Sequence, residues 1–258
     1  MNGAFEIGAV ALRADQKALE LLANNIANVN TPAFKRSDAR FAAILANQVQ
    51  PDGTLATAVA ADAAALNGGV RLAPHAMLFA QGELRPTGNT MDLAIDGQGF
   101  IELMGPAGQT LLWRGGTLRV DEDGALATRE GLPLRTGITV PADATSLTIT
   151  AEGVVKAGTS GGEVIELGQI ALVRAEHEGA LEQMDGGLLR PTDDAQLRDA
   201  VPGEDGAGLF VQGSLEGSNV TLTDEMVQLL MIQRAFAANA QALQTADQLA
   251  AITNNLKK

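Results

Sequence analysis

The residues of this chain that could perform chemistry are few. The run Gly158-Thr-Ser-Gly-Gly162 has the spacing of a nucleophile elbow, in which a serine hydroxyl attacks a carbonyl carbon. An elbow requires a strand before the serine and a helix after it, but the residues that follow Gly162 predict another strand. Cysteine is absent, which excludes thiolate catalysis, disulfides and thiolate metal sites.

Two acidic segments contain residue types that bind metal ions. Asp121-Glu-Asp-Gly124 resembles the start of a calcium loop, but Ala125 stands close after it where oxygen ligands belong, so a turn is the better interpretation. His177 is one of only two histidines, and Glu176-His177-Glu178 predicts an exposed charged loop rather than a metal site. We therefore expect no catalytic residue, no metal site and no cofactor.

Two other functional classes stay open on the residues alone. A secreted β-rich enzyme that acts on carbohydrates would need two carboxylates in one cleft, and Asp92, Asp96, Glu102 and Asp121 are the candidates. A secreted binding module would instead be a monomer with ordered termini. Loss of a hydrolytic activity on mutation of the carboxylates, without loss of assembly, would identify the enzyme.

The net charge of −13 is concentrated in the middle of the chain. Residues 1–45 carry five basic and four acidic groups and residues 218–258 carry three of each, which leaves ten basic and twenty-four acidic groups between them. An acidic middle argues against nucleic acid or an anionic membrane as a partner. No apolar run reaches the length of a membrane span or forms a secretory signal, so we expect no membrane insertion and no cleaved signal peptide.

The two ends of the chain predict long helices. Toward the C-terminus, apolar residues recur in steps of three, four and seven from Leu222 onward, which places one stripe along a helix that begins at Ser218 or Thr223. The stripe consists of Leu222, Met226, Leu229, Ile232, Phe236, Leu243, Ala246 and Ala250.

The N-terminal helix shows a heptad pattern. Its a-type positions are Phe5, Leu12, Leu19 and Ile26, and its d-type positions are Gly8, Asp15, Leu22 and Val29. Glycine and aspartate at d positions predict a weaker seam in the first two turns. The helix should end at Asn30-Thr31-Pro32, and Ser37 to Gln50 could extend or follow it. Two facing stripes predict a coiled-coil-like stem, although packing of both helices on an ordinary core is equally compatible.

Four asparagines, Asn24, Asn25, Asn28 and Asn30, fall on the polar side of the N-terminal helix. Asparagine is a poor helix former, so a merely solvated face would carry lysine or glutamate instead. We expect the amides to bond to neighbouring subunits, and capping or turn formation is the alternative.

The pattern in the middle of the chain predicts a linker followed by strands. Residues 51–69 are small and bounded by Pro-Asp-Gly and Asn-Gly-Gly, which is typical of a linker, although the alanine run could form a short helix. From about residue 70 to 212, short apolar runs alternate with turns at 121–124 and 151–153. Trp113, the sole tryptophan, predicts a core position or an interface anchor.

These patterns predict an α+β fold: terminal helices paired as a stem, with an antiparallel all-β domain inserted between them. We expect residues 1–45 and 217–258 to form the stem domain, 46–80 the linker and 81–216 the β domain.

The ends also carry a resemblance to a known family. Leu22-Ala-Asn-Asn-Ile-Ala-Asn-Val-Asn-Thr-Pro-Ala-Phe-Lys-Arg36 resembles the N-terminal signature of flagellar rod and hook proteins, and Gly213-Ser-Leu-Glu-Gly-Ser-Asn-Val220 with Gln233-Arg-Ala-Phe236 resembles their C-terminal signature. The length and the stretch from Gly97 to Phe100 are most similar to the distal-rod members, with a proximal-rod paralogue as the alternative. The chain departs from the pattern at 46–69 and in the hairpin near 100–116, where Leu112-Trp-Arg-Gly-Gly116 replaces a tyrosine-containing run.

The resemblance implies a structural subunit of the bacterial flagellar distal rod. Such subunits are exported unfolded and polymerise through their terminal helices into a tube that crosses the periplasm and transmits torque from motor to hook. The implied partners are further copies of the chain, other rod proteins, the hook protein, the export apparatus and the surrounding ring proteins. The predicted subunit-interface residues are Leu12, Leu19, Leu22, Asn25, Ile26, Asn28, Val29, Leu222, Met226, Leu229, Ile232, Phe236 and Leu243.

Overall fold

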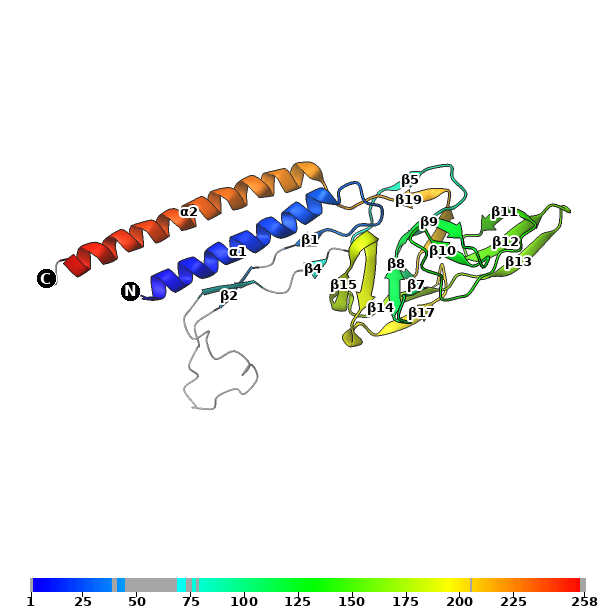
Figure 1. Cartoon of the computed structure of the whole chain (residues 1–258), viewed down its shortest axis with the longest axis horizontal. Helices are drawn as coiled ribbons and strands as arrows, with labels where there is room; N and C mark the ends of the chain where they lie inside the picture. The colour runs from blue at the N-terminus through cyan, green and yellow to red at the C-terminus, as the bar shows by residue number, and fades with distance from the viewer. Residues whose placement is uncertain are drawn as a thin grey trace. The chain divides into compact units, whose positions relative to one another are not determined.

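The computed structural model describes residues 2–38, 41–44, 69–72, 76–77, 79–204 and 206–255. The chain divides into two compact units. The first, which we call the helical unit, contains Met1–Ala27, Ser37–Ala76 and Thr221–Lys258, and the second, the β unit, contains Asn28–Arg36 and Met77–Val220. Two long helices and antiparallel sheets make the fold α+β, as the sequence predicts (Figure 1).

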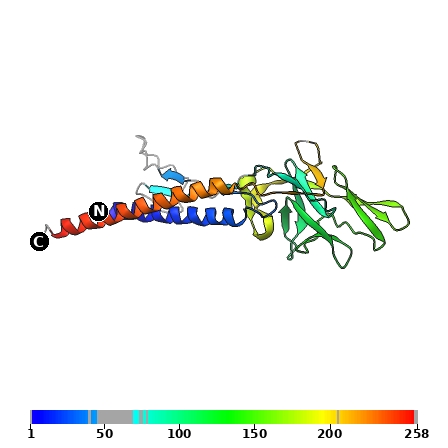
Figure 2. The same ribbon diagram turned by 90° about the horizontal axis from the view of Figure 1, so that it is seen from above.

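The helical unit is built on α1 (Asn2–Ala27) and α2 (Leu222–Asn255), which lie side by side and antiparallel in both ribbon views (Figures 1 and 2). Beside them are β1 (Ser37–Asp38) and the antiparallel pair β2 (Phe41–Ile44) and β3 (Gly69–Leu72). The short strand β4 (Ala76–Met77) spans the boundary between the units. In the described part of the chain, neither helix has an apolar stretch long enough to cross a membrane.

Two predictions about this unit are wrong in detail. The second helix begins at Leu222 rather than at Ser218 or Thr223, and the Glu225 N–H donates to the Thr221 carbonyl in its first turn (3.1 Å). The described residues between Ser37 and Ile44 form strands instead of extending the first helix, because β2 pairs with β3 over its whole length. Residues 45–68, which include most of the predicted linker, lie outside the described residues.

The β unit contains short antiparallel strands and three single-turn 3₁₀ helices. The strands are β5 (Leu84–Pro86), β6 (Asp92–Asp96), β7 (Phe100–Met104), β8 (Thr110–Trp113), β9 (Gly115–Val120), β10 (Leu126–Thr128), β11 (Ala144–Ile149), β12 (Val154–Thr159), β13 (Val164–Gln169), β14 (Leu172–Ala175), β15 (Leu181–Gln183), β16 (Leu188–Pro191), β17 (Leu197–Ala200), β18 (Leu209–Gln212) and β19 (Ser214–Glu216). The 3₁₀ helices are η1 (Glu178–Ala180), η2 (Asp185–Gly187) and η3 (Asp193–Ala195).

These strands form a six-stranded sheet in the order β15-β16-β8-β7-β14-β17, a four-stranded sheet β10-β9-β6-β18, a three-stranded sheet β11-β12-β13 and the pair β19-β5. The predicted turns at 121–124 and 151–153 are confirmed, since they join β9 to β10 and β11 to β12. The apolar runs at 132–134 and 138–140 form isolated bridges instead of strands, such as Leu103 with Leu134. The run from Val164 to Val173 is interrupted at Ile170 and forms parts of two strands.

The main core of the β unit is aliphatic and surrounds Trp113, which is 5% exposed. This confirms the core interpretation of the sole tryptophan. A Cβ at Gly116 would lie 2.7 Å from Trp113 Cζ2, and the Gly116 φ of +152° is one that side chains disfavour. The indole of Trp113 occupies the space that a side chain at position 116 would need. This accounts for the presence of tryptophan and glycine together in the divergent Trp-Arg-Gly-Gly run.

Candidate functional site

The contact between α1 and α2 is the first candidate site. A Cβ at Gly8 would lie 2.8 Å from Leu243 Cδ1, so the Leu243 side chain packs directly against the glycine backbone and would have to shift for a larger residue. Two turns later, Asn239 Nδ2 donates to Asp15 Oδ2 (2.8 Å). The d-type positions Gly8 and Asp15 thus face α2. Gly8 is in close packing contact with Leu243, and Asp15 forms a polar contact with Asn239.

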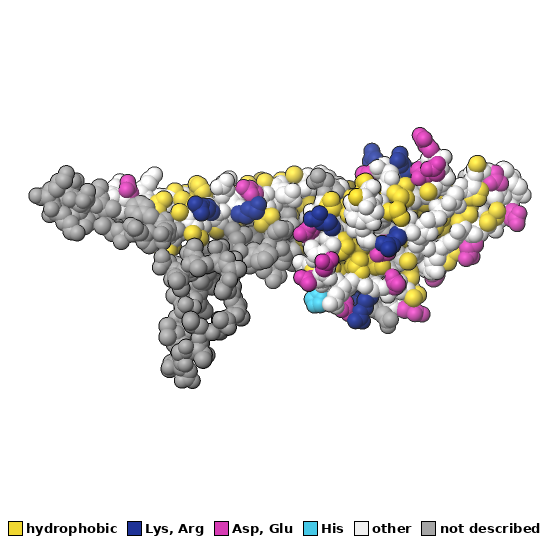
Figure 3. All heavy atoms as spheres, turned by 60° about the horizontal axis from the view of Figure 1, so that its bottom comes forward, with side chains coloured by type: hydrophobic (Ala, Val, Ile, Leu, Met, Phe, Trp, Pro, Cys, Tyr) yellow, Lys and Arg dark blue, Asp and Glu magenta, His cyan; other side chains and the backbone are white. Residues whose placement is uncertain are grey.

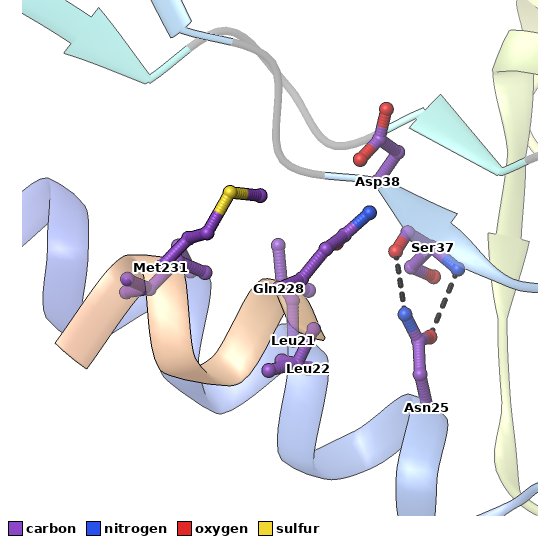
Figure 4. A pocket seen from close by; sticks show the side chains of 9 residues that line it. Leu21, Leu22, Asn25, Ser37, Asp38, Gln228 and Met231 are labelled. Carbon is purple, nitrogen blue, oxygen red and sulfur yellow. Dashed lines mark hydrogen bonds between the residues drawn. The ribbon is translucent and has the colours of Figure 1, made fainter. Parts of the chain in front are cut away.

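Asn25 is the centre of a buried polar cluster at the other end of this contact (Figure 4). Its side chain is 1% exposed, and its Nδ2 donates to the Ser37 carbonyl (2.8 Å) and to Glu225 Oε2 (3.1 Å). Its Oδ1 accepts from the Ser37 N–H (3.0 Å). The prediction that Asn25 lies on the polar side of the helix is therefore wrong. An amide has both donors and an acceptor, so Asn25 can bond to a backbone segment and to the carboxylate of α2 together.

The other predicted residues of the first segment are buried to different degrees. Leu22 is 3% exposed and belongs to the core of the helical unit, and four others are half-buried: Leu12, Leu19, Ile26 and Val29. Asn28 lies in the β unit, after the end of α1, where its Oδ1 accepts from the Thr31 hydroxyl (3.0 Å). This hydrogen bond stabilises the turn that follows α1, as the turn-forming alternative expects, and a contact of Asn28 with a neighbouring subunit stays a prediction.

On α2, the predicted residues divide between two faces. Leu229, Ile232 and Leu243 are half-buried, whereas Leu222, Met226 and Phe236 are 46%, 55% and 40% exposed. Three further apolar residues of α2 were not among the predicted ones: Val227, Leu230 and Met231, which are 52%, 57% and 60% exposed. The signal was present, because apolar residues in the first three turns recur on almost every side of the helix and a single stripe accounts for only some of them.

We call the exposed residues of these turns the α2 patch: Leu222, Met226, Val227, Leu230 and Met231. Spacings of four residues place Leu222, Met226 and Leu230 in one row and Val227 and Met231 in a second. Figure 3 shows hydrophobic side chains at the surface of both units, and most of the acidic side chains on the face drawn lie over the β unit.

A pocket of about 220 Å³ adjoins this patch at Met231 (Figure 4). Apolar side chains of both helices line it, together with polar side chains that include Asn25 and Gln228. Its other lining residues are Ala18, Leu21, Leu22, Ser37, Asp38 and Ile232.

The β unit contains a second buried polar cluster, none of whose residues was predicted as a site residue. Glu216 Oε1 accepts from Lys35 Nζ (2.6 Å) and from the Gly82 N–H (2.9 Å), and its Oε2 accepts from Arg114 Nε (3.2 Å) and Nη2 (3.1 Å). Lys35 also donates to the Ala80 carbonyl (3.0 Å). Burial lowers the pKa of the Lys35 ammonium below its ordinary value, and the carboxylate of Glu216 opposes that shift.

This cluster joins the two signature segments near the ends of the β unit. The Ala33 N–H donates to the Glu216 carbonyl (2.8 Å), and Asn219 Oδ1 accepts from the Arg36 N–H (2.7 Å). Asn219 Nδ2 also donates to the Ala80 carbonyl (2.9 Å). The Thr-Pro-x-Phe-Lys run and the Gly-Ser-Leu-Glu-Gly-Ser-Asn run are therefore mutual partners. The only sequence signal for Lys35 and Glu216 is that they are charged residues within signatures whose other residues are almost all uncharged.

The residues that resembled catalytic or metal-binding motifs have structural partners. Ser160 lies in the turn between β12 and β13, with a strand on each side. Asp121 Oδ1 accepts from the Asp123 and Ala125 N–H groups (3.0 and 2.7 Å), which confirms the turn interpretation. The residues that the structure describes contain no group of three or more acidic or histidine side chains placed to hold a metal ion.

The carboxylates considered for an enzyme are bound separately. Asp92 is buried and accepts from the Thr87 and Thr117 hydroxyls (2.6 and 2.7 Å). Asp96 accepts from Gln81 Nε2 (3.3 Å), and Glu102 forms an ion pair with Arg135 (3.6 Å). Each of these three carboxylates therefore has a side-chain partner within the β unit.

Three family profiles match the chain. Residues 5–35 match the profile described as flagella basal body rod protein, residues 94–157 the flagellar hook protein FlgE/F/G D1 domain, and residues 211–256 the flagellar basal body rod FlgEFG protein C-terminal segment. The matched segments include α1, strands from β6 to β12, and α2.

Curated relatives match over nearly the whole length. The flagellar basal-body rod protein FlgG of Borreliella burgdorferi is 34% identical over 100% of both chains, and FlgG of Caulobacter vibrioides is 32% identical over 98% of this chain and 99% of the relative. The rod protein FlgF of the same Caulobacter strain is 28% identical over 96% of this chain and 95% of the relative.

Proposed function

Because the chain belongs to the family of flagellar basal-body rod proteins, we propose that it polymerises through its terminal helices into the tubular distal rod, a shaft that transmits torque from motor to hook. The chain is a structural subunit of the bacterial flagellum and not an enzyme. Assignment to the distal rather than the proximal rod is supported by the higher identity to FlgG than to FlgF within one organism.

The observation that carries the assembly proposal is the α2 patch. Its five apolar side chains are each 46–60% exposed on adjacent turns of one helix. Burial of apolar surface contributes about 25 cal/mol per Å², so covering such residues stabilises an assembly. A contiguous exposed apolar surface on a protein of this family marks a contact with another subunit.

We assign one role to each of the predicted domains. Residues 1–45 with 217–258 act as the coiled-coil-like stem that packs into the tube, residues 81–216 act as an inserted β domain, and residues 46–80 link them. The polar contacts of Asp15 with Asn239 and of Asn25 with Glu225 support pairing of the two helices in register. The excess of acidic groups in the middle of the chain suits a domain that faces solvent.

The remaining partners follow from the family. We expect the subunit to contact other rod proteins and the hook protein, to pass through the flagellar export apparatus without a cleaved signal peptide, and to lie inside the surrounding ring proteins where the rod crosses the periplasm. The relatives named as basal-body rod proteins support this location.

The proposal is tested with three aspartate substitutions. Met226→Asp and Phe236→Asp introduce a carboxylate at predicted interface residues that are 55% and 40% exposed. Gln241→Asp introduces it at an exposed polar position that is not part of the predicted apolar stripe of the same helix. Burying an unpaired carboxylate costs several kcal/mol, so the first two variants should fail to pellet as polymer and fail to restore swimming to a strain that lacks the rod subunit.

Gln241→Asp is the matched control and should assemble and swim like the parent chain. Far-UV circular dichroism of the unassembled subunits separates loss of assembly from loss of helix. Equal assembly of all three variants would refute polymerisation through this helix.

A further inference from the structure

A pocket in the β unit lies beside the buried cluster around Glu216. Its volume is about 250 Å³, and Lys35 and Arg114 of that cluster are among the residues that line it. All of the lining residues belong to Asn28–Arg36 or Met77–Val220, so the pocket is formed within the β unit alone. It shares no residue with the α2 patch, and the proposed assembly through α2 leaves it without a role.

The buried charges of the cluster do not balance. Lys35 and Arg114 carry two positive charges on side chains that are 2% and 5% exposed, whereas Glu216, at 1%, carries one negative charge. The cluster thus contains one more buried cation than buried carboxylates. Because a buried charge without a counter-charge is costly, an anion that reaches these cations is bound favourably.

Hydrogen-bond donors of the two cations are also left over. An ammonium has three N–H groups, and Lys35 uses two of them, on Glu216 and on the Ala80 carbonyl (2.6 and 3.0 Å). A guanidinium has five, and Arg114 uses three, two on Glu216 and one on the Gly99 carbonyl (2.7 Å). One N–H group of Lys35 and two of Arg114 therefore have no partner among the residues that the structure describes.

Aromatic rings form a second wall of the pocket. The rings of Phe79 and Phe100 meet edge to face with centroids 6.0 Å apart, and the Arg114 guanidinium carbon lies 5.8 Å from the Phe100 centroid. The face of an aromatic ring attracts a cation, so Phe100 helps to fix the guanidinium. The side-chain amides of Gln81 and Gln98 also line the pocket, but both bond to other residues of the β unit.

We propose that this pocket binds a carboxylate group on a short apolar stem, with its oxygens on the remaining N–H groups of Lys35 and Arg114 and its stem against Phe79 and Phe100. A carboxylate only accepts hydrogen bonds, so it matches the donors that are left over, and it supplies the missing negative charge. A neutral amide supplies no charge, and a cation would add a third positive charge. Two sources present such a group: a small organic acid, and an acidic side chain of another polypeptide.

Binding is measured by NMR on the full chain labelled with ¹⁵N. The Nε–H group of Arg114 is buried and donates to Glu216 (3.2 Å), so its resonance reports on the pocket. Sodium benzoate provides the small acid, and a glycine-glutamate-glycine peptide blocked at both ends provides the acidic side chain. Benzamide and the corresponding glutamine peptide are their neutral isosteres. At least one acid should shift the resonance saturably, at a concentration about tenfold or more below that of its isostere.

Glu178 provides a variant that leaves the buried cluster intact. It is the one carboxylate among the described residues that line the pocket, and its side chain is exposed. Its negative charge opposes the entry of a second carboxylate, so Glu178→Gln should lower the half-saturating concentration of the acid about threefold, the effect of an exposed charge pair. Glu122→Gln, at an exposed position of the turn at 121–124, is the matched control and should leave that concentration unchanged.

The acid that binds more tightly identifies the source of the carboxylate. Tighter binding of benzoate supports a small organic acid, and tighter binding of the peptide supports an acidic side chain of another chain. An equal response to each acid and its isostere would overturn the proposal. An equal response to inorganic phosphate would show a general contact with anions and would overturn it too. A saturable response that Glu178→Gln does not change would place the ligand outside this pocket, with the same consequence.

Discussion

Replacing Glu216 by glutamine is the sharpest test of the buried polar cluster in the β unit. The carboxylate accepts four hydrogen bonds and lies between two cations, Lys35 and Arg114, whose side chains are 2% and 5% exposed. Glutamine keeps the shape of the side chain but removes the negative charge. The NH₂ group of the glutamine would also stand in place of one carboxylate oxygen, so its N–H donors would face the N–H donors of Lys35 and Gly82 or of Arg114.

The expected cost follows from leaving buried charges without a counter-charge. Removing one partner of a buried ion pair destabilises a protein by about 3–5 kcal/mol. In a unit of this size, each kcal/mol lowers the melting temperature by about 2–4 °C. We therefore expect Glu216→Gln to lower the melting temperature of the β unit by roughly 6–20 °C.

The fluorescence of Trp113 provides the assay. This sole tryptophan lies in the core of the β unit, so its emission in a urea titration of the full chain follows unfolding of that unit alone. Glu83→Gln is the matched control, because Glu83 pairs with Arg85 at 3.0 Å while both side chains are at least 70% exposed. Exposed pairs contribute about 0–1 kcal/mol, so the control should unfold close to the parent.

A double-mutant cycle separates charge from packing. Lys35→Met leaves Glu216 paired with Arg114 alone. Adding Glu216→Gln in that background therefore leaves one buried cation without a counter-charge instead of two. The cost of Glu216→Gln should therefore fall by about 0.5–3 kcal/mol in the Lys35→Met background. The reasoning is refuted if Glu216→Gln changes the free energy of unfolding no more than Glu83→Gln does.

Two further predictions concern Asn25 and Lys35. Asn25→Ala should destabilise the helical unit by about 1–3 kcal/mol, because Ser37 and Glu225 lose a buried amide partner. Gln16→Ala at an exposed position of the same helix should be nearly neutral by far-UV circular dichroism in urea. The pKa of Lys35 is lowered from 10.5 in the fold, so the unfolded chain binds this proton more tightly and raising the pH toward 10.5 favours the folded state. The free energy of unfolding of the parent minus that of Lys35→Met should rise with pH in this range, and a flat or falling difference would contradict the shift.

The terminal helices were predictable because helical periodicity is a local property of the sequence. Their partner faces were only partly predictable. The heptad pattern placed Gly8 and Asp15 in the α1–α2 contact but as weak positions, and it placed Asn25 on the polar side although its side chain bonds to Glu225 of α2. Leu222 and Met226 were placed on the same stripe as Ile232, yet they are exposed and Ile232 is half-buried, because the contact follows the polar pairs as well as the apolar ones.

The cluster around Glu216 could not be predicted from a single sequence, for a different reason. Lys35 and Glu216 are 181 residues apart along the chain, and Arg114 is 102 residues from Glu216. Spacing rules describe neighbours within a helix, strand or turn and carry no information about such pairs. The same limit applies to strand pairing, since β6 lies between β9 and β18, whereas the hairpin turn at 121–124 was found from its local residues.

The two polar clusters and the α2 patch have opposite physical roles. A buried ion cluster contributes little net stability compared with an apolar core of the same volume, but it permits only the one arrangement in which every charge is paired. An exposed apolar patch tolerates many arrangements and contributes energy only when it is covered. Glu216 variants should therefore unfold the β unit without altering the α2 patch, and Met226→Asp should abolish assembly while the Trp113 unfolding transition stays unchanged. If assembly fell in proportion to the free energy of unfolding in the Glu216 variants and in Met226→Asp alike, then stability of the β unit and assembly through α2 would not be separate properties.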